Sequence, residues 1–261
     1  MADRKYKIVM VNYLNSKPFE FGLMNSEAKD IFEICAANPA QCAAAIQNDK
    51  ADIALIPVGA LLDMSDYQII TPYCIGCDGD VRTVCLMSHQ PINECKTLVL
   101  DDHSRTSFLL SQILIREVFN KDIPIKKADV QHYQPQDGDI ILMIGDKVFD
   151  REKDFKYNYD LGALWKEMTG LPFVFAVWIT KSHIETDAID LLNDAFDTGI
   201  KNLDEVIAKE SSENLDLYFY FHHNISYDLD DKKQAALKLF FEKTATLLNK
   251  SATTSDNKSE I

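Results

Sequence analysis

Two short polar stretches of the sequence carry side chains that could bind a small anion. Asn15 and Ser16 form the first and follow an apolar run at residues 6–11 after three intervening residues. Four neighbouring residues form the second, which follows the apolar run at residues 97–100 after three intervening residues: Ser104, Arg105, Thr106 and Ser107. Both stretches precede predicted helices, whose free backbone amides favour negative charge. The pattern predicts two halves of a carboxylate-binding site, with the Arg105 guanidinium as a bidentate donor.

Each stretch also has a simpler structural interpretation. Asn15 and Ser16 are common turn residues and could form a plain strand-to-helix bend. Ser104 or Thr106 could cap a helix beside a solvated Arg105. Residues outside the two stretches offer little general-base chemistry: His103 and Asp146 are the candidates, and each can equally serve as a hydrogen-bonding loop residue.

The elements around Asn15 predict a parallel sheet. The run before Asn15 has strand composition, Asn38 and Pro39 are N-cap and first residue of a helix, and residues 52–58 form a buried strand. This order favours a parallel sheet with right-handed crossovers, whose ligands bind beyond the carboxyl ends of the strands. Asn15 and the loop at residues 57–59 should therefore face one crevice.

A second unit repeats this arrangement. It runs from the strand at residues 97–100, through a helix at 108–119, to a buried strand that ends at Gly145 and Asp146. We expect the loop after Ser88 to cross between two lobes. The aromatic cluster at residues 218–221 is interpreted as core packing.

Composition limits the partners. The net charge of −14 argues against nucleic acid and anionic membranes, both of which need a basic surface. Cys74 and Cys77 form a CxxC pair, but no second pair follows at zinc-site spacing, so we predict no metal. Residues 1–5 lead straight into a strand without an apolar signal segment, and we therefore expect a cytoplasmic protein.

The polar loops together resemble those of a known family. The matching segments follow one another between residues 6 and 180 and comprise residues 13–19, 52–58, Asp101 with 104–107, 144–146, 159–162 and 165–178. In this set the chain is similar to the menaquinone-biosynthesis chorismate dehydratases of the futalosine pathway. Their fold resembles that of type II periplasmic binding proteins.

The resemblance implies an α/β fold with two lobes, each a mostly parallel sheet flanked by helices, and a ligand cleft between them. We expect one lobe to comprise residues 1–88 and 180–249 and the other residues 89–179. Residues 250–261 are polar and lack periodicity, which predicts a disordered tail.

The implied activity is removal of water from chorismate, a small dicarboxylate, to give 3-[(1-carboxyvinyl)oxy]benzoate without a cofactor. The resemblance makes Asn15 the catalytic residue, orienting a substrate whose own enolpyruvyl carboxylate acts as the base. It also implies substrate contacts from Ser16, Thr83, Gly145 and Asp146 beside the second polar stretch. Thr83 stands where a serine is expected in many members.

Two alternatives remain at this point. One is 1,4-dihydroxy-6-naphthoate synthase, a later enzyme of the same pathway that shares the fold. The other is a binding protein that closes on a small anion without chemistry. The segment at residues 14–18 favours the dehydratase. Lys17 either contacts a carboxylate or is solvated.

Overall fold

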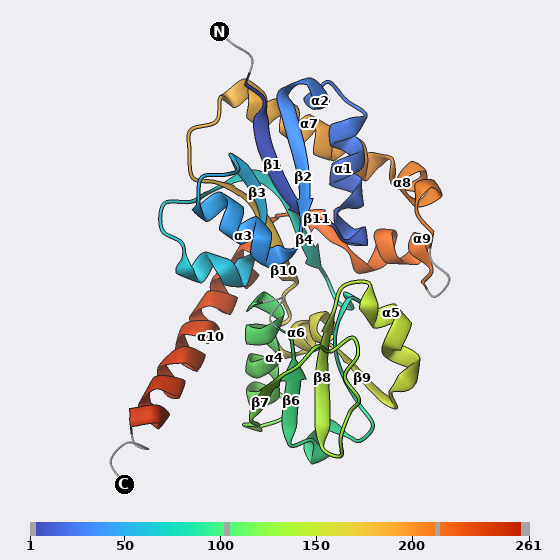
Figure 1. Cartoon of the computed structure of the whole chain (residues 1–261), viewed down its shortest axis with the longest axis vertical. Helices are drawn as coiled ribbons and strands as arrows, with labels where there is room; N and C mark the ends of the chain where they lie inside the picture. The colour runs from blue at the N-terminus through green and yellow to red at the C-terminus, as the bar shows by residue number, and fades with distance from the viewer. Residues whose placement is uncertain (1–3, 102–104, 212–214, 257–261) are drawn as a thin grey trace.

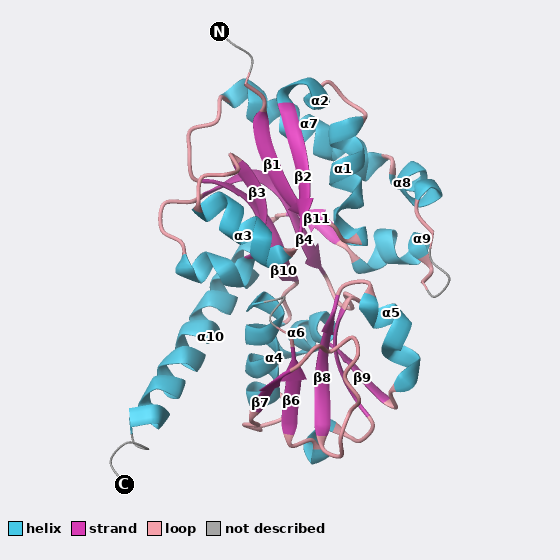
Figure 2. Ribbon diagram, viewed as in Figure 1, coloured by secondary structure: helices cyan, strands magenta, loops and turns pink. Residues whose placement is uncertain are grey.

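Two mixed β-sheets, each flanked by helices, follow one another along the length of the molecule (Figure 1; Figure 2). The computed structural model describes residues 4–101, 105–211 and 215–256. We call the part around the six-stranded sheet the large lobe and the part around the five-stranded sheet the small lobe. The expected two-lobed α/β fold is confirmed.

The large-lobe sheet has the strand order β11-β4-β10-β3-β1-β2. Its strands are β1 (Tyr6–Val11), β2 (Phe32–Ala37), β3 (Ile53–Pro57), β4 (Gln68–Cys77), β10 (Phe173–Thr180) and β11 (Ser226–Asp228). The helices of this lobe are η1 (Leu14–Ser16), α1 (Lys17–Met24), α2 (Ala28–Ile31), α3 (Pro39–Gln47), η2 (Val58–Asp63), α7 (Thr186–Lys201), α8 (Leu203–Lys209), α9 (Leu217–Phe219) and the π-helix η5 (Tyr220–Asn224).

The small-lobe sheet has the order β7-β6-β8-β5-β9. Its strands are β5 (Val84–Ser88), β6 (Thr97–Leu100), β7 (Ile125–Lys127), β8 (Asp139–Ile144) and β9 (Tyr157–Asp160). The helices are η3 (Ile92–Glu94), α4 (Arg105–Glu117), α5 (Lys147–Arg151), η4 (Glu152–Asp154) and α6 (Leu161–Thr169). The last helix, α10 (Asp231–Asp256), contacts β10 and α4 and so lies against both lobes.

Both sheets are mixed, which corrects the expectation of mostly parallel sheets. β1 pairs in parallel with β2 and β3, but β10 is antiparallel to both β3 and β4. In the small lobe, β6 is parallel to β7 and β8, whereas β5 is antiparallel to β8 and β9. The reason is that the chain passes between the lobes twice, before β5 and again before β10. β5 and β10 each begin where the chain enters a lobe from the cleft, so they run opposite to strands that end there.

The crossing points also differ from the expected boundaries. The expected first lobe, with residues 1–88, includes β5, but β5 pairs within the small-lobe sheet. The chain therefore crosses between Cys77 and Val84 rather than after Ser88. β10 was assigned to the second lobe, but it lies between β4 and β3 of the large-lobe sheet. The expected disordered tail is wrong for its first part, because α10 extends to Asp256; residues 257–261 lie outside the described part.

Local sequence signals explain the helix that reaches the cleft from the large lobe. Asn38 Oδ1 accepts from the Gln41 backbone N–H at 2.9 Å, and Gln41 Oε1 accepts from the Asn38 N–H at 3.1 Å. This reciprocal capping box, with Pro39 as the first helical residue, fixes the start of α3 as predicted. Because α3 contacts β1 and β3, its N-terminus lies at the carboxyl ends of these strands.

Aromatic packing sets the position of α1 and of the turn before it. Phe19 lies 5.4 Å from Trp178 of β10 and 4.6 Å from Phe196 of α7, measured between ring centroids. All three side chains are fully buried. Since Phe19 is only four residues after Asn15, this cluster anchors η1 to the sheet.

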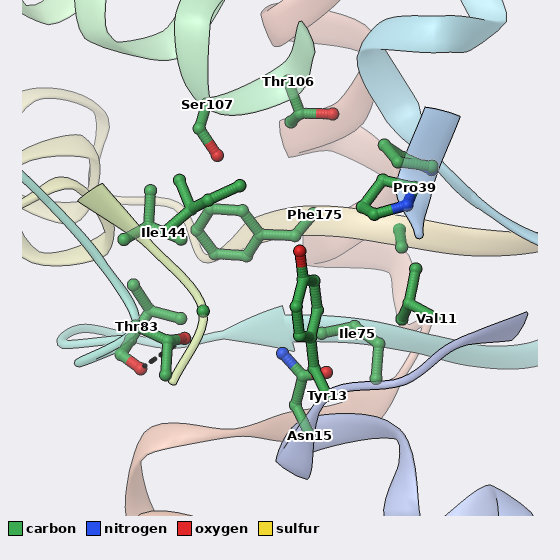
Figure 3. A pocket seen from close by; sticks show the side chains of 15 residues that line it. Val11, Tyr13, Asn15, Pro39, Ile75, Thr83, Thr106, Ser107, Ile144 and Phe175 are labelled. Carbon is green, nitrogen blue, oxygen red and sulfur yellow. Dashed lines mark hydrogen bonds between the residues drawn. The ribbon is translucent and has the colours of Figure 1, made fainter. Parts of the chain in front are cut away.

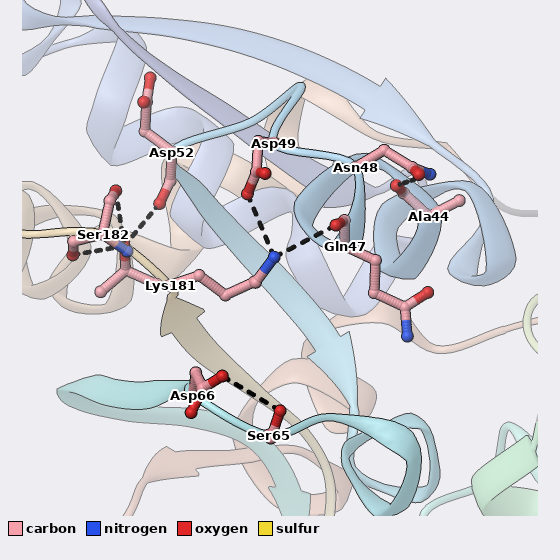
Figure 4. A network of polar contacts seen from close by, with 10 residues as sticks. Ala44, Gln47, Asn48, Asp49, Asp52, Ser65, Asp66, Lys181 and Ser182 are labelled. Atoms are coloured by element: carbon pink, nitrogen blue, oxygen red, sulfur yellow. Dashed lines mark hydrogen bonds and ion pairs between the residues drawn. The ribbon is translucent and has the colours of Figure 1, made fainter.

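The end of the large-lobe sheet opposite the cleft carries a polar network, which we call the far-end network (Figure 4). Lys181 Nζ donates to the Gln47 carbonyl and to Asp49 Oδ1, both at 3.1 Å. Thr180 Oγ1 donates to the Asp52 carbonyl at 2.7 Å. These bonds join the end of β10 to the start of β3.

Candidate active site

A pocket of about 560 Å³, which includes space open to solvent, lies between the two lobes (Figure 3). The large lobe contributes Val11, Tyr13, Asn15, Pro39, Pro57, Ile75, Phe175 and Ala176. The small lobe and the segment leading into it contribute Val81, Thr83, Val84, Thr106, Ser107, Ile144 and Gly145. The lining is thus mainly apolar, with a few hydroxyl and amide groups on opposite sides, as in many small-molecule sites.

Asn15 lies in the 3-10 turn that follows β1, with its carboxamide beside Tyr13 (Figure 3). Ser16 stabilises this turn: its Oγ lies 2.6 Å from the Val11 carbonyl and 2.8 Å from the Tyr13 carbonyl. Ser16 is therefore a structural residue of the turn and does not line the pocket, contrary to the expected substrate contact. The Tyr227 hydroxyl, from β11, donates to the Asn15 carbonyl at 3.1 Å.

The Asn15 side chain is partly buried and has unused hydrogen-bonding capacity. Its Oδ1 is buried and has no hydrogen-bond partner among the described residues. A buried polar atom of this kind costs about 1–3 kcal/mol of stability. Lys17, the next polar residue of the stretch, forms an ion pair with Glu20 at 2.9 Å and is not among the lining residues.

The first turn of α4 forms the opposite wall. Thr106 and Ser107 line the pocket, and Figure 3 shows the Ser107 hydroxyl directed into it. Thr106 Oγ1 accepts from the Gly59 N–H at 2.9 Å, a contact between the lobes. A Cβ on Gly59 would lie 2.7 Å from the Thr106 nitrogen, so only glycine allows this close approach. Ser104 and His103 lie outside the described residues.

Arg105 does not occupy the expected position. It forms an ion pair with Asp63 of η2, again across the lobes, and is not among the residues that line the pocket. Its side chain is 40% exposed. The structure therefore corrects the expectation of a guanidinium in the site, since a partner in the other lobe takes up its charge.

Thr83 and Gly145 form the side wall at the entrance to the small lobe. Thr83 is buried, and its Oγ1 donates to the Val81 carbonyl at 3.4 Å. The Gly145 N–H donates to the Thr83 carbonyl at 2.8 Å, which joins these two residues. Gly145 has a φ of 71°, and a Cβ there would lie 3.2 Å from the Tyr13 ring. Glycine thus allows both the left-handed backbone and the ring contact.

Asp146 lies behind this wall rather than in the lining. Its Oδ2 accepts from the Leu14 N–H at 3.4 Å, whereas its Oδ1 is buried without a partner among the described residues. Burial raises the pKa of this carboxyl, although the Leu14 N–H opposes the rise. Asp146 therefore connects the lobes through the Leu14 N–H and is not among the described residues that line the pocket.

Sequence reasoning missed the apolar part of the site and Tyr13. Tyr13 lies two residues before Asn15, and no local signal in the sequence distinguishes a tyrosine that faces a pocket from one that packs in the core. Burial raises the pKa of its phenol, and the charges of Asp101 and Asp146 add to the rise. Phe175 was predicted only as part of a buried strand, and no local signal indicates that it faces a cleft.

The other candidate groups of the sequence are buried or dispersed. Cys74 and Cys77 are free and buried, and burial raises the pKa of both thiols. Within the described ranges, no group of three or more His, Cys, Asp or Glu side chains is placed to hold a metal ion. None of the described helices combines the length and the apolar character needed to cross a membrane.

Several solved structures share the fold of this chain. Protein AF1704 from Archaeoglobus fulgidus is 16% identical, with a TM-score of 0.71 over 93% of this chain and 97% of that one. An ABC transporter from Parabacteroides distasonis is 15% identical, with a TM-score of 0.65 over 94% and 93%. The CA3427 gene product of Candida albicans, described as having the generic periplasmic binding protein fold, is 10% identical, with a TM-score of 0.59 over 94% and 95%. This chain has the periplasmic-binding-protein fold.

The family is identified by sequence. A family model described as menaquinone biosynthesis matches residues 6–246. The match covers nearly the whole chain and extends well beyond residue 180, where the resemblance in the polar loops ended. The protein belongs to this menaquinone-biosynthesis family, and its role lies in menaquinone synthesis.

Proposed function

We propose that this protein is a chorismate dehydratase, which eliminates water from chorismate to give 3-[(1-carboxyvinyl)oxy]benzoate on the futalosine route to menaquinone. One observation carries the proposal: a menaquinone-biosynthesis protein has a pocket between its lobes, with an amide whose buried oxygen has no partner among the described residues on one side and hydroxyls at a helix N-terminus on the other. Chorismate is a small dianion with a hydrocarbon ring, and this combination of polar and apolar lining suits it.

Helix N-termini rather than cations would hold the carboxylates. The described lining residues include no Lys or Arg. They do include Pro39, the first residue of α3, and Thr106 and Ser107 in the first turn of α4. The helix dipole favours an anion at both positions, although at α3 Pro39 has no N–H and the Gln41 N–H already donates to Asn38 Oδ1. The Ser107 hydroxyl adds a donor on the α4 side, and Thr83 adds one from the side wall.

The reaction needs a base for the proton on the ring carbon that bears the ether. The described lining residues include no Asp, Glu, His or Lys. This supports a substrate-assisted route, in which the enolpyruvyl carboxylate takes that proton. The neighbouring C–O bond then breaks, the hydroxyl departs as water with a proton, and the ring becomes aromatic. No net oxidation occurs, so the reaction calls for no redox cofactor.

Asn15 is proposed to orient the reacting groups. A carboxamide can donate to the departing hydroxyl or to the carboxylate without adding negative charge beside a dianion. Tyr13 adds a second neutral group, because a phenol is protonated at neutral pH and burial raises its pKa further. The apolar residues Ile75, Ile144 and Phe175 would contact the ring and exclude water.

The test is conversion of chorismate by the purified protein, after dialysis against a chelator and without added cofactor. Chromatography should show one 3-[(1-carboxyvinyl)oxy]benzoate formed for each chorismate consumed, at a rate proportional to protein concentration and absent without protein. Folded protein that forms no product contradicts the proposal. Chorismate binding without turnover would instead support a binding protein, and 1,4-dihydroxy-6-naphthoate formation from the later pathway intermediate would support the sister enzyme.

A further inference from the structure

Tyr13 carries the one titratable side chain among the described residues that line the pocket. Figure 3 shows its hydroxyl directed into the pocket. The other polar side chains of the described lining are the carboxamide of Asn15 and the aliphatic hydroxyls of Thr83, Thr106 and Ser107. These groups can hydrogen-bond, but they do not ionise in the range of a phenol. Tyr13 is therefore the best placed of these residues to give a proton to a bound molecule.

Both lobes fix the position of the Tyr13 ring. On the large-lobe side, the Tyr13 carbonyl accepts from the Ser16 N–H at 3.1 Å, and Ser16 Oγ lies 2.8 Å from the same carbonyl. On the small-lobe side, the ring lies so close to Gly145 that a Cβ there would be 3.2 Å from it. The hydroxyl thus takes its place in the pocket where the two lobes meet, as a group that acts on an enclosed substrate should.

The surroundings of Tyr13 keep its phenol neutral. Burial raises the pKa of Tyr13, and Asp101, Asp146 and the Cys42 thiol add to the rise. These three groups lie at the end of β6, at the end of β8 and in α3. A phenol of this kind carries its proton at neutral pH. It can donate that proton without placing a negative charge beside a dianion before the reaction begins.

The proposed dehydration needs such a donor at the departing hydroxyl. Hydroxide leaves with difficulty, because its conjugate acid, water, has a pKa of about 15.7. An ordinary phenol, with a pKa of about 10, is a much stronger acid, so even a raised pKa leaves proton transfer to the departing oxygen favourable. The Asn15 amide can orient that oxygen but cannot give up a proton to it.

We propose that Tyr13 is the general acid of the dehydration and gives its phenol proton to the departing hydroxyl. The enolpyruvyl carboxylate takes the ring proton, and the electron pair of that C–H bond forms the new ring double bond. The electron pair of the breaking C–O bond leaves with the oxygen, which the Tyr13 proton converts to water. The phenolate then regains a proton from the carboxylic acid formed in the first step. Protons and electrons balance, and the inference rests on the proposed function.

The first test is Tyr13→Phe, with Tyr73→Phe as the matched control. Tyr73 is another tyrosine of the large lobe, packed against Phe19 and outside the pocket lining. In Y13F, kcat should fall about 100- to 10,000-fold, the usual contribution of a general acid, and KM should change less than about fivefold. Y73F should keep both constants. The melting temperature of Y13F should stay near that of the wild type, because the ring and its contact with Gly145 remain.

A second measurement distinguishes a proton donor from a residue that only packs or orients. Fluorinated tyrosines at position 13 keep the ring and the hydroxyl but lower the pKa of the phenol with each added fluorine. Because a phenolate cannot donate, the fall of kcat at alkaline pH should move to lower pH along this series. The same fluorotyrosines at position 73 should leave the pH profile unchanged.

The outcomes separate this inference from the proposed function. If the wild type converts chorismate but Y13F keeps its kcat, Tyr13 is not the acid while the dehydratase proposal holds. A fall of kcat that stays at one pH throughout the fluorotyrosine series leads to the same conclusion. If the wild type forms no product from chorismate, the dehydratase proposal itself fails, and the role of Tyr13 fails with it.

Discussion

The polar groups at the two ends of the large-lobe sheet differ in how fully they are hydrogen-bonded. In the far-end network, Lys181 Nζ donates to Asp49 Oδ1 at 3.1 Å, and Thr180 Oγ1 donates to the Asp52 carbonyl at 2.7 Å (Figure 4). At the cleft, three buried atoms from separate elements have no partner among the described residues: Asn15 Oδ1, Asp146 Oδ1 and Tyr220 Oη. Folding alone explains the first region. The second carries unsatisfied groups that stability would disfavour.

The location of the unpaired atoms matters more than their presence. The described chain holds other buried atoms of this kind, on Arg116, Trp178, Asn193 and Thr244, and of the seven residues concerned only Asn15 lines the pocket. Around Asn15, in contrast, a carboxamide, a carboxyl and a phenol are near one another at the junction of the lobes. The cleft end of the large-lobe sheet therefore carries polar groups that folding alone does not explain.

The largest effect is expected at Asn15 itself. Asn15→Ala should abolish turnover of chorismate, with a loss of at least about a thousandfold, because the amide acts on the reacting groups. Its melting temperature should stay near that of the wild type, since Oδ1 makes no bond that is lost. Asn48→Ala is the matched control from the far end, where Asn48 only donates to the Ala44 carbonyl. Turnover by N15A at the N48A rate would contradict the assignment.

A pair of threonines should show opposite behaviour. Thr180→Val removes the donor to the Asp52 carbonyl and should lower the free energy of unfolding by about 1–3 kcal/mol without changing kcat/KM. Thr83→Val removes a hydroxyl whose bond within the protein is long, at 3.4 Å, and should lower kcat/KM roughly tenfold with little effect on stability. Denaturant unfolding and steady-state kinetics on both variants give the answer. If T83V lost stability and kept its activity, Thr83 would have a structural role like that of Thr180, and the contrast between the two regions would be wrong.

Loss of the Arg105 side chain should have only a small effect on kcat/KM. Because it pairs with Asp63 across the lobes and both side chains are well exposed, Arg105→Ala should change kcat/KM by less than about fivefold. Asp63→Ala should have the same effect, since either variant breaks the same contact. If R105A raised KM far more than D63A did, Arg105 would contact the substrate directly, as the sequence suggested.

The smallest effect is a pH-dependent one at Asp146. Burial raises its folded pKa above the ordinary 3.8, so the folded protein binds this proton more tightly than the unfolded chain does. The group therefore favours folding below pH 3.8, and this contribution is lost as the pH rises through the folded pKa. Asp146→Asn should be more stable than the wild type at pH 7, and the difference should shrink toward pH 4. A difference that is constant over this range would show that Asp146 has an ordinary pKa.

Local signals in the sequence were enough for the single elements near the site. The helix after Asn38 is confirmed because its cap, its proline and its alanine-rich body all lie within a few residues. Strands at residues 6–11 and 139–144 are confirmed because their apolar runs are short and end at polar tips. These signals also placed Asn15, Thr106 and Gly145, which the structure brings together in one pocket.

Local signals in the sequence do not determine which strands pair or which side chains from distant segments meet. The composition of β5 suits either sheet, and only its pairing with β8 and β9 assigns it to the small lobe. The neighbour of Arg105 is Asp63, which no spacing rule connects to it. Tyr220 and Tyr227 lie more than 200 residues from Asn15, and their aromatic surroundings suggested only core packing.

The most direct test of the central claim is a crystal structure of the N15A variant with chorismate, since this variant should bind the substrate without consuming it. We predict chorismate in the pocket between η1 and the first turn of α4, with its carboxylates on the N-terminal ends of α3 and α4 and its ring against Phe175. Chorismate bound elsewhere, or a pocket that stays without it at saturating concentration in solution and in the crystal, would contradict the account.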